Sequence, residues 1–180
     1  MILPQHLNCL CRWEIEYLAK LGLDRDRILT DPQNRIWAAR IISHGSTCHI
    51  TDDNRVARYF VTGSDNTWSD FVAFDYTGNR WWTFEDPLWA LGAPYWPNFY
   101  EVEQGNITIF DNIFPWLASA RKGIVVPSWG WGDTLRGYLN EVPKIICANQ
   151  ILAEKVKFLL PHRKSDIFVP LAQLTGTEAA

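Results

Sequence analysis

The chain has 180 residues, of which 47% are hydrophobic and 21% charged, and its net charge is -3. These values are typical of folded proteins and exclude an intrinsically disordered chain. They also argue against extensive binding to a nucleic-acid backbone, because such binding depends on many Lys and Arg side chains that release counterions.

The amino terminus lacks a basic start, an apolar run and a small-residue cleavage site, so no secretory signal is predicted. No apolar stretch approaches the ~20 residues needed to cross a bilayer. The sequence therefore predicts a cytoplasmic protein without membrane contact.

Two helices are predicted near the amino terminus. Residues 4–21 carry apolar side chains at steps of three and four, which is typical of an amphipathic helix, and Gly22 suits its end. The charged residues 24–27 predict a short second helix, which Asp31 and Pro32 would end.

The middle third predicts strands, because short segments rich in β-branched and aromatic residues alternate with polar turns. These segments are residues 36–43, 57–61, 70–76 and 80–84. The sequence Thr77-Gly78-Asn79 predicts a tight turn, so the last two strands should form an antiparallel hairpin.

A boundary is predicted after this strand region. Residues 86–92 begin with Asp-Pro and end with Gly, which predicts a helix of one or two turns. Residues 93–104 contain too much proline for a central strand and too many aromatic residues for a free linker. We therefore expect a single domain, residues 1–180, with subdomains at residues 1–92 and 105–172.

The last third alternates strands with capped helices. Strands are predicted at residues 107–110, 124–127, 144–148 and 166–169, and helices at residues 113–121, 134–141 and 150–160. Parallel neighbours need connections long enough to hold a helix, so this βαβαβαβ pattern predicts a parallel sheet. The predicted fold class is mixed α+β, with this α/β unit preceded by an N-terminal helix and an antiparallel strand region.

The loops that follow the parallel strands are the expected ligand face, because open α/β sheets bind ligands at the carboxyl ends of their strands. In the loop of residues 128–134, two glycines permit close backbone approach and two indoles could stack on a ring. The candidate ligand-binding residues are Asp111, Ser128, Trp129, Trp131, Asp133, Thr134 and Asn149. A structural explanation competes with this one, since Asp111, Asp133 and Asn149 would also serve as helix N-caps.

The leading hypothesis is a non-catalytic protein that binds an unknown small ligand or a protein partner with this loop and the nearby aromatic residues, because no complete acid, base and nucleophile set can be assembled. The alternative is a metal-assisted enzyme in which Asp111 and Asp133 hold Mg²⁺ against a phosphorylated or nucleotide-like substrate. The succession of strand, Gly- and Asp-containing loop, helix and strand resembles the Toprim-type domain of primases. That domain's strand-end glutamate and D-x-D are missing here, so we do not assign the chain to that family and keep an inactive relative, a degenerate nucleic-acid-processing domain, only as part of the alternative.

Six of the eight Cys and His residues fall within the first 49 positions, and these are ligand types that Zn²⁺ prefers. The weak metal candidates are His6, Cys9, Cys11, His44, Cys48 and His49. No paired C-x₂-C spacing is present, and Cys11 belongs to the apolar stripe of the first helix, so no cofactor is strongly implied.

The chain is rich in tryptophan, with ten Trp residues. Trp81 and Trp82 are adjacent in a predicted strand, so they point to opposite faces. A homo-oligomer interface is the simplest explanation for the second ring, because interfaces are enriched in aromatic residues.

Overall fold

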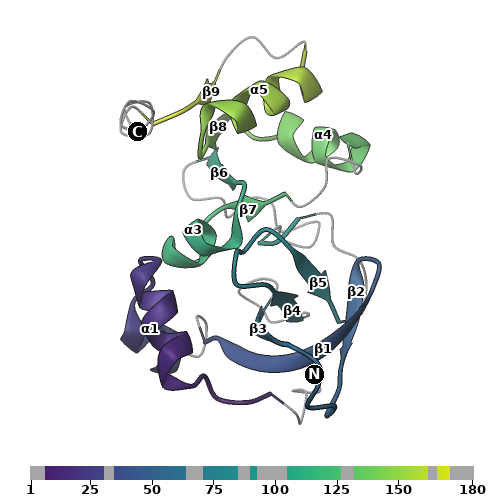
Figure 1. The fold of residues 1–180 in the computed structure, drawn as a ribbon. Coiled ribbons are helices and arrows are strands. Elements are labelled where there is room, and N and C mark those ends of the chain that lie inside the picture. Colours follow the sequence, from purple (N-terminus) through teal and green to yellow (C-terminus); the bar gives the residue numbers. More distant parts are fainter. Residues whose placement is uncertain are drawn as a thin grey trace, which may run out of the picture. The chain divides into compact units, whose positions relative to one another are not determined.

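The computed structural model describes residues 7–30, 35–63, 71–84, 90–92, 105–126, 132–161 and 166–170. The predicted mixed α+β class is confirmed: N-terminal helices are followed by a five-stranded barrel and then by a four-stranded parallel sheet with helices (Figure 1). The chain forms two compact units, which we call the barrel unit (Met1–Leu88 and Asn112–Arg121) and the sheet unit (Trp89–Asp111 and Lys122–Ala180). No helix among the described residues has the length and apolar character needed to span a membrane.

The first helix, α1 (Arg12–Lys20), begins later than the predicted residue 4. The start was wrong because Asn8 pairs with Ala38 instead, through backbone hydrogen bonds of 2.9 and 3.0 Å. Cys11 is the N-cap, and its N–H donates to the Glu14 carboxylate at 2.8 Å. Gly22, at φ 88°, follows the helix as predicted, and α2 (Arg25–Thr30) confirms the second helix.

Five strands close into a barrel in the order β1-β2-β5-β4-β3. They are β1 (Trp37–His44), β2 (Thr47–Ile50), β3 (Arg58–Gly63), β4 (Phe71–Phe74) and β5 (Trp81–Thr83). All the pairings are antiparallel except that of β2 with β5, which joins Thr47 to Thr83. The four predicted strands are thus present, whereas β2 was not predicted, because its four residues show no clear apolar alternation.

The predicted hairpin of β4 and β5 is confirmed, with Ala73 opposite Trp82 and Phe74 opposite Trp81. Its turn needs glycine at residue 78, where φ is +70° and a Cβ atom would lie 2.6 Å from the Asn112 Oδ1 atom and 2.7 Å from the Phe114 ring. The turn is therefore fitted closely to the start of α3 (Ile113–Ala118), which also belongs to the barrel unit.

An aromatic cluster joins α1 and α3 to β3 and β4. The Phe60 ring lies 5.5 Å from Phe74 and 4.7 Å from Tyr76, and the Phe114 ring lies 5.7 Å from Phe74. Tyr17 contacts Phe114 edge to face at 6.5 Å. Each such pair contributes about 0.5–1.5 kcal/mol beyond its area burial. A second buried cluster includes Ala39 of β1, Val61 of β3 and Ala73 of β4, and the last two alternate along their strands with Phe60 and Phe74, so they point to the opposite face. Both faces of the strands are thus packed.

A buried ion pair lies beside this cluster. Glu14 is fully buried, and its carboxylate lies 3.1 Å from the Arg58 guanidinium and 3.4 Å from the Tyr76 hydroxyl. Burial, followed by the charge of Glu14, raises the pKa of Tyr76 to about 12. Removing either ionic partner would leave an uncompensated charge, so the pair belongs to the architecture of the barrel unit.

The predicted parallel sheet is confirmed in the sheet unit, with the strand order β7-β6-β8-β9. Its strands are β6 (Asn106–Phe110), β7 (Ile124–Val125), β8 (Lys144–Cys147) and β9 (Ile167–Phe168), all parallel to their neighbours. The helices α4 (Gly132–Asn140) and α5 (Gln150–Leu159) alternate with the last strands, and α5 contacts β8 and β9 (Figure 1). One apolar cluster fills the unit, with Ile109, Leu139 and Ile145 fully buried.

Two predicted features fall largely outside the described residues. The short helix at residues 86–92 is described only at 90–92, where Leu91 forms an antiparallel bridge with Val125. The connection at residues 93–104 lies outside the described ranges.

Candidate functional site

The carboxyl edge of the parallel sheet contains one point where the chain connections diverge. The connection that leaves β6 leads to β7 on one side, and the connection that leaves β8 leads to β9 on the other side. Open α/β sheets bind ligands at such a switch point, because the diverging loops leave room above the strand ends. Here it falls between β6 and β8, which are hydrogen-bonded neighbours.

Two of the predicted site residues meet at this switch point. Asp111 follows the last residue of β6, and Asn149 lies two residues beyond β8. The Asn149 Nδ2 group donates to the Asp111 Oδ2 atom at 2.5 Å, and the Ala148 N–H donates to the Ile109 carbonyl at 2.9 Å. The strand pairing thus fixes the spacing of the two side chains.

The two side chains differ in the hydrogen-bonding groups that remain available to a ligand. The Asn149 Oδ1 atom accepts from the Leu152 N–H at 2.9 Å, which confirms the predicted N-cap of α5, so both ends of this amide are occupied. Asp111 is exposed, and among the described residues its carboxylate is bonded only to Asn149. The site therefore presents a carboxylate oxygen, a hydrogen-bond acceptor with a negative charge.

The predicted capping roles of two aspartates are wrong. Asn112, one residue after Asp111, is the N-cap of α3 and accepts from the Phe114 N–H at 2.9 Å. Asp133 lies inside the first turn of α4, because that helix already begins at Gly132. Its side chain is 98% exposed and lies 3.6 Å from Arg136. Neither aspartate is thus explained by capping.

The remaining candidates of the predicted loop are only partly described. Thr134 is an exposed residue of α4, whereas Ser128, Trp129 and Trp131 lie outside the described residues.

The Cys and His residues do not gather into one metal centre within the described ranges, where no three His, Cys, Asp or Glu side chains are placed to hold an ion. Cys9 is exposed, Cys11 caps α1, and Cys48 is buried. His44 and His49 lie together on the hairpin of β1 and β2, with ring nitrogens 3.2 Å apart, and His6 lies outside the described residues. The structure thus brings His44 and His49 within bonding distance of each other.

The buried thiol of the sheet unit is a poor nucleophile. Burial raises the pKa of Cys147 to about 12, so the thiol is protonated at neutral pH. Cys147 therefore packs as a small apolar residue below the strand end.

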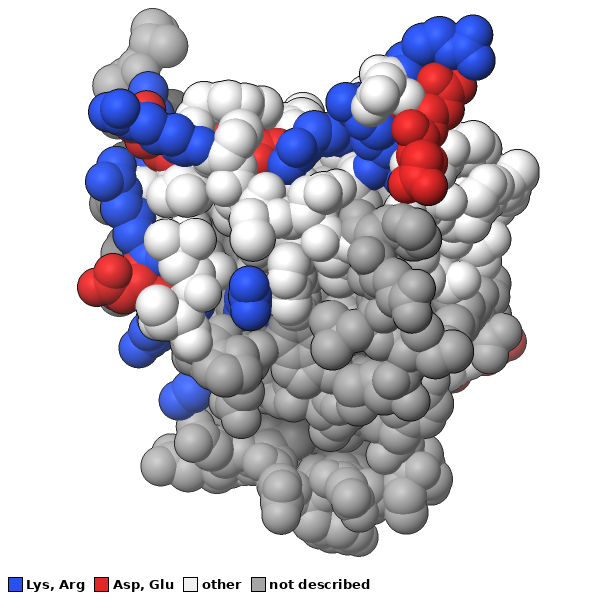
Figure 2. All heavy atoms as spheres, turned by 90° about the horizontal axis from the view of Figure 1, so that it is seen from below, with Lys and Arg blue, Asp and Glu red and all other residues white. Residues whose placement is uncertain are grey.

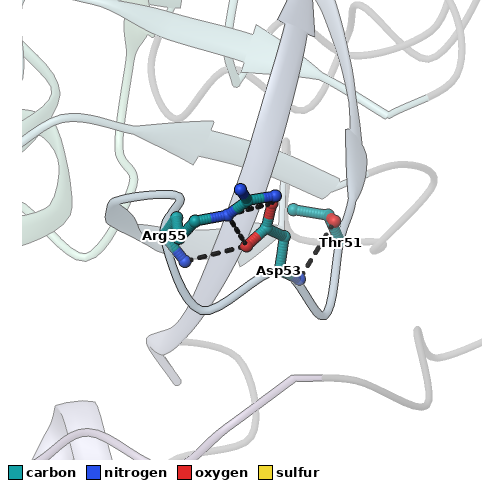
Figure 3. A network of polar contacts seen from close by, with 3 residues as sticks. All are labelled: Thr51, Asp53 and Arg55. Atoms are coloured by element: carbon teal, nitrogen blue, oxygen red, sulfur yellow. Dashed lines mark hydrogen bonds and ion pairs between the residues drawn. The ribbon is translucent and has the colours of Figure 1, made fainter.

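Some charged side chains on the barrel unit are paired locally. In the loop after β2, the Arg55 side chain lies 2.9 Å from the Asp53 carboxylate, and the Asp53 N–H donates to Thr51 Oγ1 at 3.2 Å (Figure 3). The hydrogen bonds from Arg55 hold the pKa of Asp53 below its usual value. Along the upper rim of the view in Figure 2, acidic and basic side chains lie next to one another. Such solvated pairs shape loops and offer little to a ligand.

Comparison of the chain with protein-family models, with curated proteins and with solved structures finds no match.

Proposed function

We propose that the protein is a non-catalytic binding protein whose ligand contacts the carboxyl edge of the sheet unit. The observation that carries this proposal is the meeting of Asp111 and Asn149 at the switch point between β6 and β8. The spacing of the two side chains is fixed before any ligand arrives, which lowers the entropy cost of binding.

The available carboxylate oxygen of Asp111 favours a ligand with hydrogen-bond donors. Asn149 accepts the Leu152 N–H with its oxygen and donates one hydrogen bond from Nδ2 to Oδ2 of Asp111, whereas the exposed Asp111 carboxylate has a second oxygen for a ligand. A hydroxyl or amine group would complement that oxygen, as the ribose hydroxyls of nucleotides do at acidic residues of other α/β sheets. In this proposal the indoles of Trp129 and Trp131 stack on the same ligand.

A fragment screen followed by nuclear magnetic resonance tests the proposal. We expect hydroxyl- and amine-bearing fragments to shift the backbone amides around Asp111 and Asn149, and Asp111→Ala to abolish these shifts. Glu141→Gln is the matched control, because it removes an exposed carboxylate of the same unit elsewhere. Fragments that shift only other amides, or none at all, would overturn the proposal.

The same experiment with MgCl₂ addresses the metal-assisted alternative. Magnesium shifts at Asp111 that vanish in Asp133→Ala would favour the enzyme over the binding protein, because they require both carboxylates to share the ion. A lack of such shifts would leave the binding proposal in place.

A protein partner is favoured by a separate observation on α5. Ile151 is 71% exposed and Phe158 is 91% exposed, and their seven-residue spacing puts them on one side of the helix. Glu154 and Lys155 lie midway between them. In an antiparallel pairing of two copies, Ile151 would meet Phe158 and Glu154 would meet Lys155 of the second copy, which is the self-complementarity that a two-fold interface requires. We therefore propose a second copy of the chain as the partner.

Sedimentation of charge variants tests this dimer. Glu154→Lys should weaken self-association by placing two cations opposite each other, and Glu154→Lys combined with Lys155→Glu should restore it. A chain that is monomeric at all concentrations, or a double variant no better than the single one, would contradict the proposal.

A further inference from the structure

The hairpin of β1 and β2 places two exposed histidine side chains on one face. Its register pairs Ile42 with His49 and His44 with Thr47. His44 and His49 are therefore diagonal neighbours on the same side of the two strands, close enough for long side chains to meet. Gly45, at φ 63°, begins the two-residue turn that holds this register.

The ring nitrogens are at a chelating distance. His44 Nε2 and His49 Nδ1 lie 3.2 Å apart, the ring centroids are 5.0 Å apart, and the ring planes differ by 12°. With metal–nitrogen bonds of about 2.0–2.1 Å, this separation corresponds to a nitrogen–metal–nitrogen angle of about 100°. That angle lies between the ~90° of a tetragonal centre and the ~109° of a tetrahedral one.

The hairpin itself keeps the two donors together. Cross-strand pairs run from Ile41 opposite Ile50 to His44 opposite Thr47, and the Thr51 N–H continues the ladder to the Arg40 carbonyl at 3.0 Å. Ion binding would therefore order two side chains and leave the backbone as it is, which is a small entropic cost.

The neighbouring thiol does not join them. Cys48 precedes His49 on β2, so its side chain points to the opposite face, where it is buried among barrel residues. No Asp, Glu or Cys of the described ranges completes a set of three with these histidines. The protein thus supplies two imidazoles, and water would fill the other positions.

We propose that His44 and His49 form a two-histidine site for a divalent transition metal on the barrel unit. Imidazole donors suit copper, nickel and zinc, and affinity at a given nitrogen site is highest for Cu²⁺. The site holds the ion through Nε2 of His44 and Nδ1 of His49, and it is independent of the ligand site proposed on the sheet unit.

Titration of the full chain with CuCl₂ and ZnCl₂, followed by calorimetry, tests the site. We expect Cu²⁺ to bind more tightly than Zn²⁺, and His44→Gln and His49→Gln each to weaken binding at least tenfold, because each leaves a single imidazole. Cys9→Ser and His162→Gln are the controls and should leave affinity within about twofold, a change well under 1 kcal/mol.

Nitrogen-15 spectra of the histidine rings give a second readout that does not depend on affinity. Zinc should shift Nε2 of His44 and Nδ1 of His49 and leave the other nitrogen of each ring less affected. The proposal is overturned if the native chain binds neither metal at millimolar concentration, if the histidine variants bind as the native chain does, or if only Cys9→Ser loses binding.

Discussion

In the barrel unit, polar side chains such as Glu14 and Tyr76 lie against packed aromatic rings and form hydrogen bonds with one another. In the sheet unit, by contrast, Asp111 and Asn149 meet at the carboxyl ends of two neighbouring strands. The difference follows from topology. In a closed barrel every strand is hydrogen-bonded to neighbours on both sides, and helices cover the barrel. A parallel sheet instead brings the carboxyl ends of all its strands to one side. The open edge of the sheet unit is therefore the better place to look for a ligand, and the barrel unit offers its hairpin surface.

The largest difference between buried and exposed aromatic residues should appear in stability. We expect Phe60→Ala to lower the free energy of unfolding by roughly 3–5 kcal/mol, because it leaves a cavity among four aromatic rings. The same change at Phe158, which is 91% exposed on α5, should stay within about 0.5 kcal/mol when measured at concentrations where the chain is monomeric. Urea denaturation measures both, and equal losses would contradict the assignment of the core.

Two glycines of the sheet unit should respond in opposite directions to the same substitution. A Cβ atom at Gly123, where φ is +101°, would lie 2.2 Å from the Thr108 carbonyl oxygen, so Gly123→Ala should cost about 1–3 kcal/mol or more. Gly137 lies in α4 with no atom within 4 Å of such a Cβ, so Gly137→Ala should stabilise by about 0.5–1 kcal/mol. Thermal unfolding of the two variants gives the comparison, and a loss in both would argue against the described course of α4.

The two asparagine caps provide a matched pair, one in each unit. Asn149→Ala should cost about 1 kcal/mol for the lost cap of α5. Asn112→Ala should cost more, about 1–2 kcal/mol, since its Nδ2 donates two hydrogen bonds, to the Thr77 carbonyl and to Asn79 Oδ1 at 2.9 and 3.0 Å, whereas the Nδ2 of Asn149 donates one, to Asp111. Chemical denaturation checks the order, and a reversed order would mean that Asn112 does not connect α3 to the turn.

Alkaline solution should reveal differences in stability that vanish at neutral pH. Burial raises the pKa of Tyr138 from 10.0 to about 12 and that of Cys147 from 9.0 to about 12. The unfolded chain would lose these protons first, so stability should fall as the pH rises from about 9 toward 12. Tyr138→Phe and Cys147→Ala should each reduce this slope, and unfolding followed across that pH range measures it. An unchanged slope would mean that both groups reach solvent.

The local elements of both units follow from the sequence for identifiable reasons. The turn at residues 77–79 predicts its hairpin because Gly78 supplies a positive φ, and the N-cap at Asn149 is visible because it directly precedes an apolar helical repeat. Asn112, by contrast, takes the cap that Asp111 was expected to fill, since both residue types cap well and only the backbone decides between neighbours.

Long-range features could not be predicted in this way. Barrel closure rests on the parallel pairing of Thr47 with Thr83, which are far apart in the sequence and carry no local signal. The meeting of His44 and His49 likewise depends on the register of a strand, β2, that lacks a clear apolar alternation. Asp111 and Asn149 could be selected from the sequence because each follows the carboxyl end of a predicted parallel strand, but their hydrogen bond to each other could not be predicted.

The position of α3 has a consequence for how the chain is made. This helix follows β6 in the sequence, yet its Phe114 packs in the aromatic cluster of the barrel unit. A nascent chain released from the ribosome only as far as the barrel strands would leave Phe60 and Phe74 without that cover. The barrel unit therefore reaches its final packing only after β6 and α3 have been synthesised, and until then the apolar rings that Phe114 covers stay exposed.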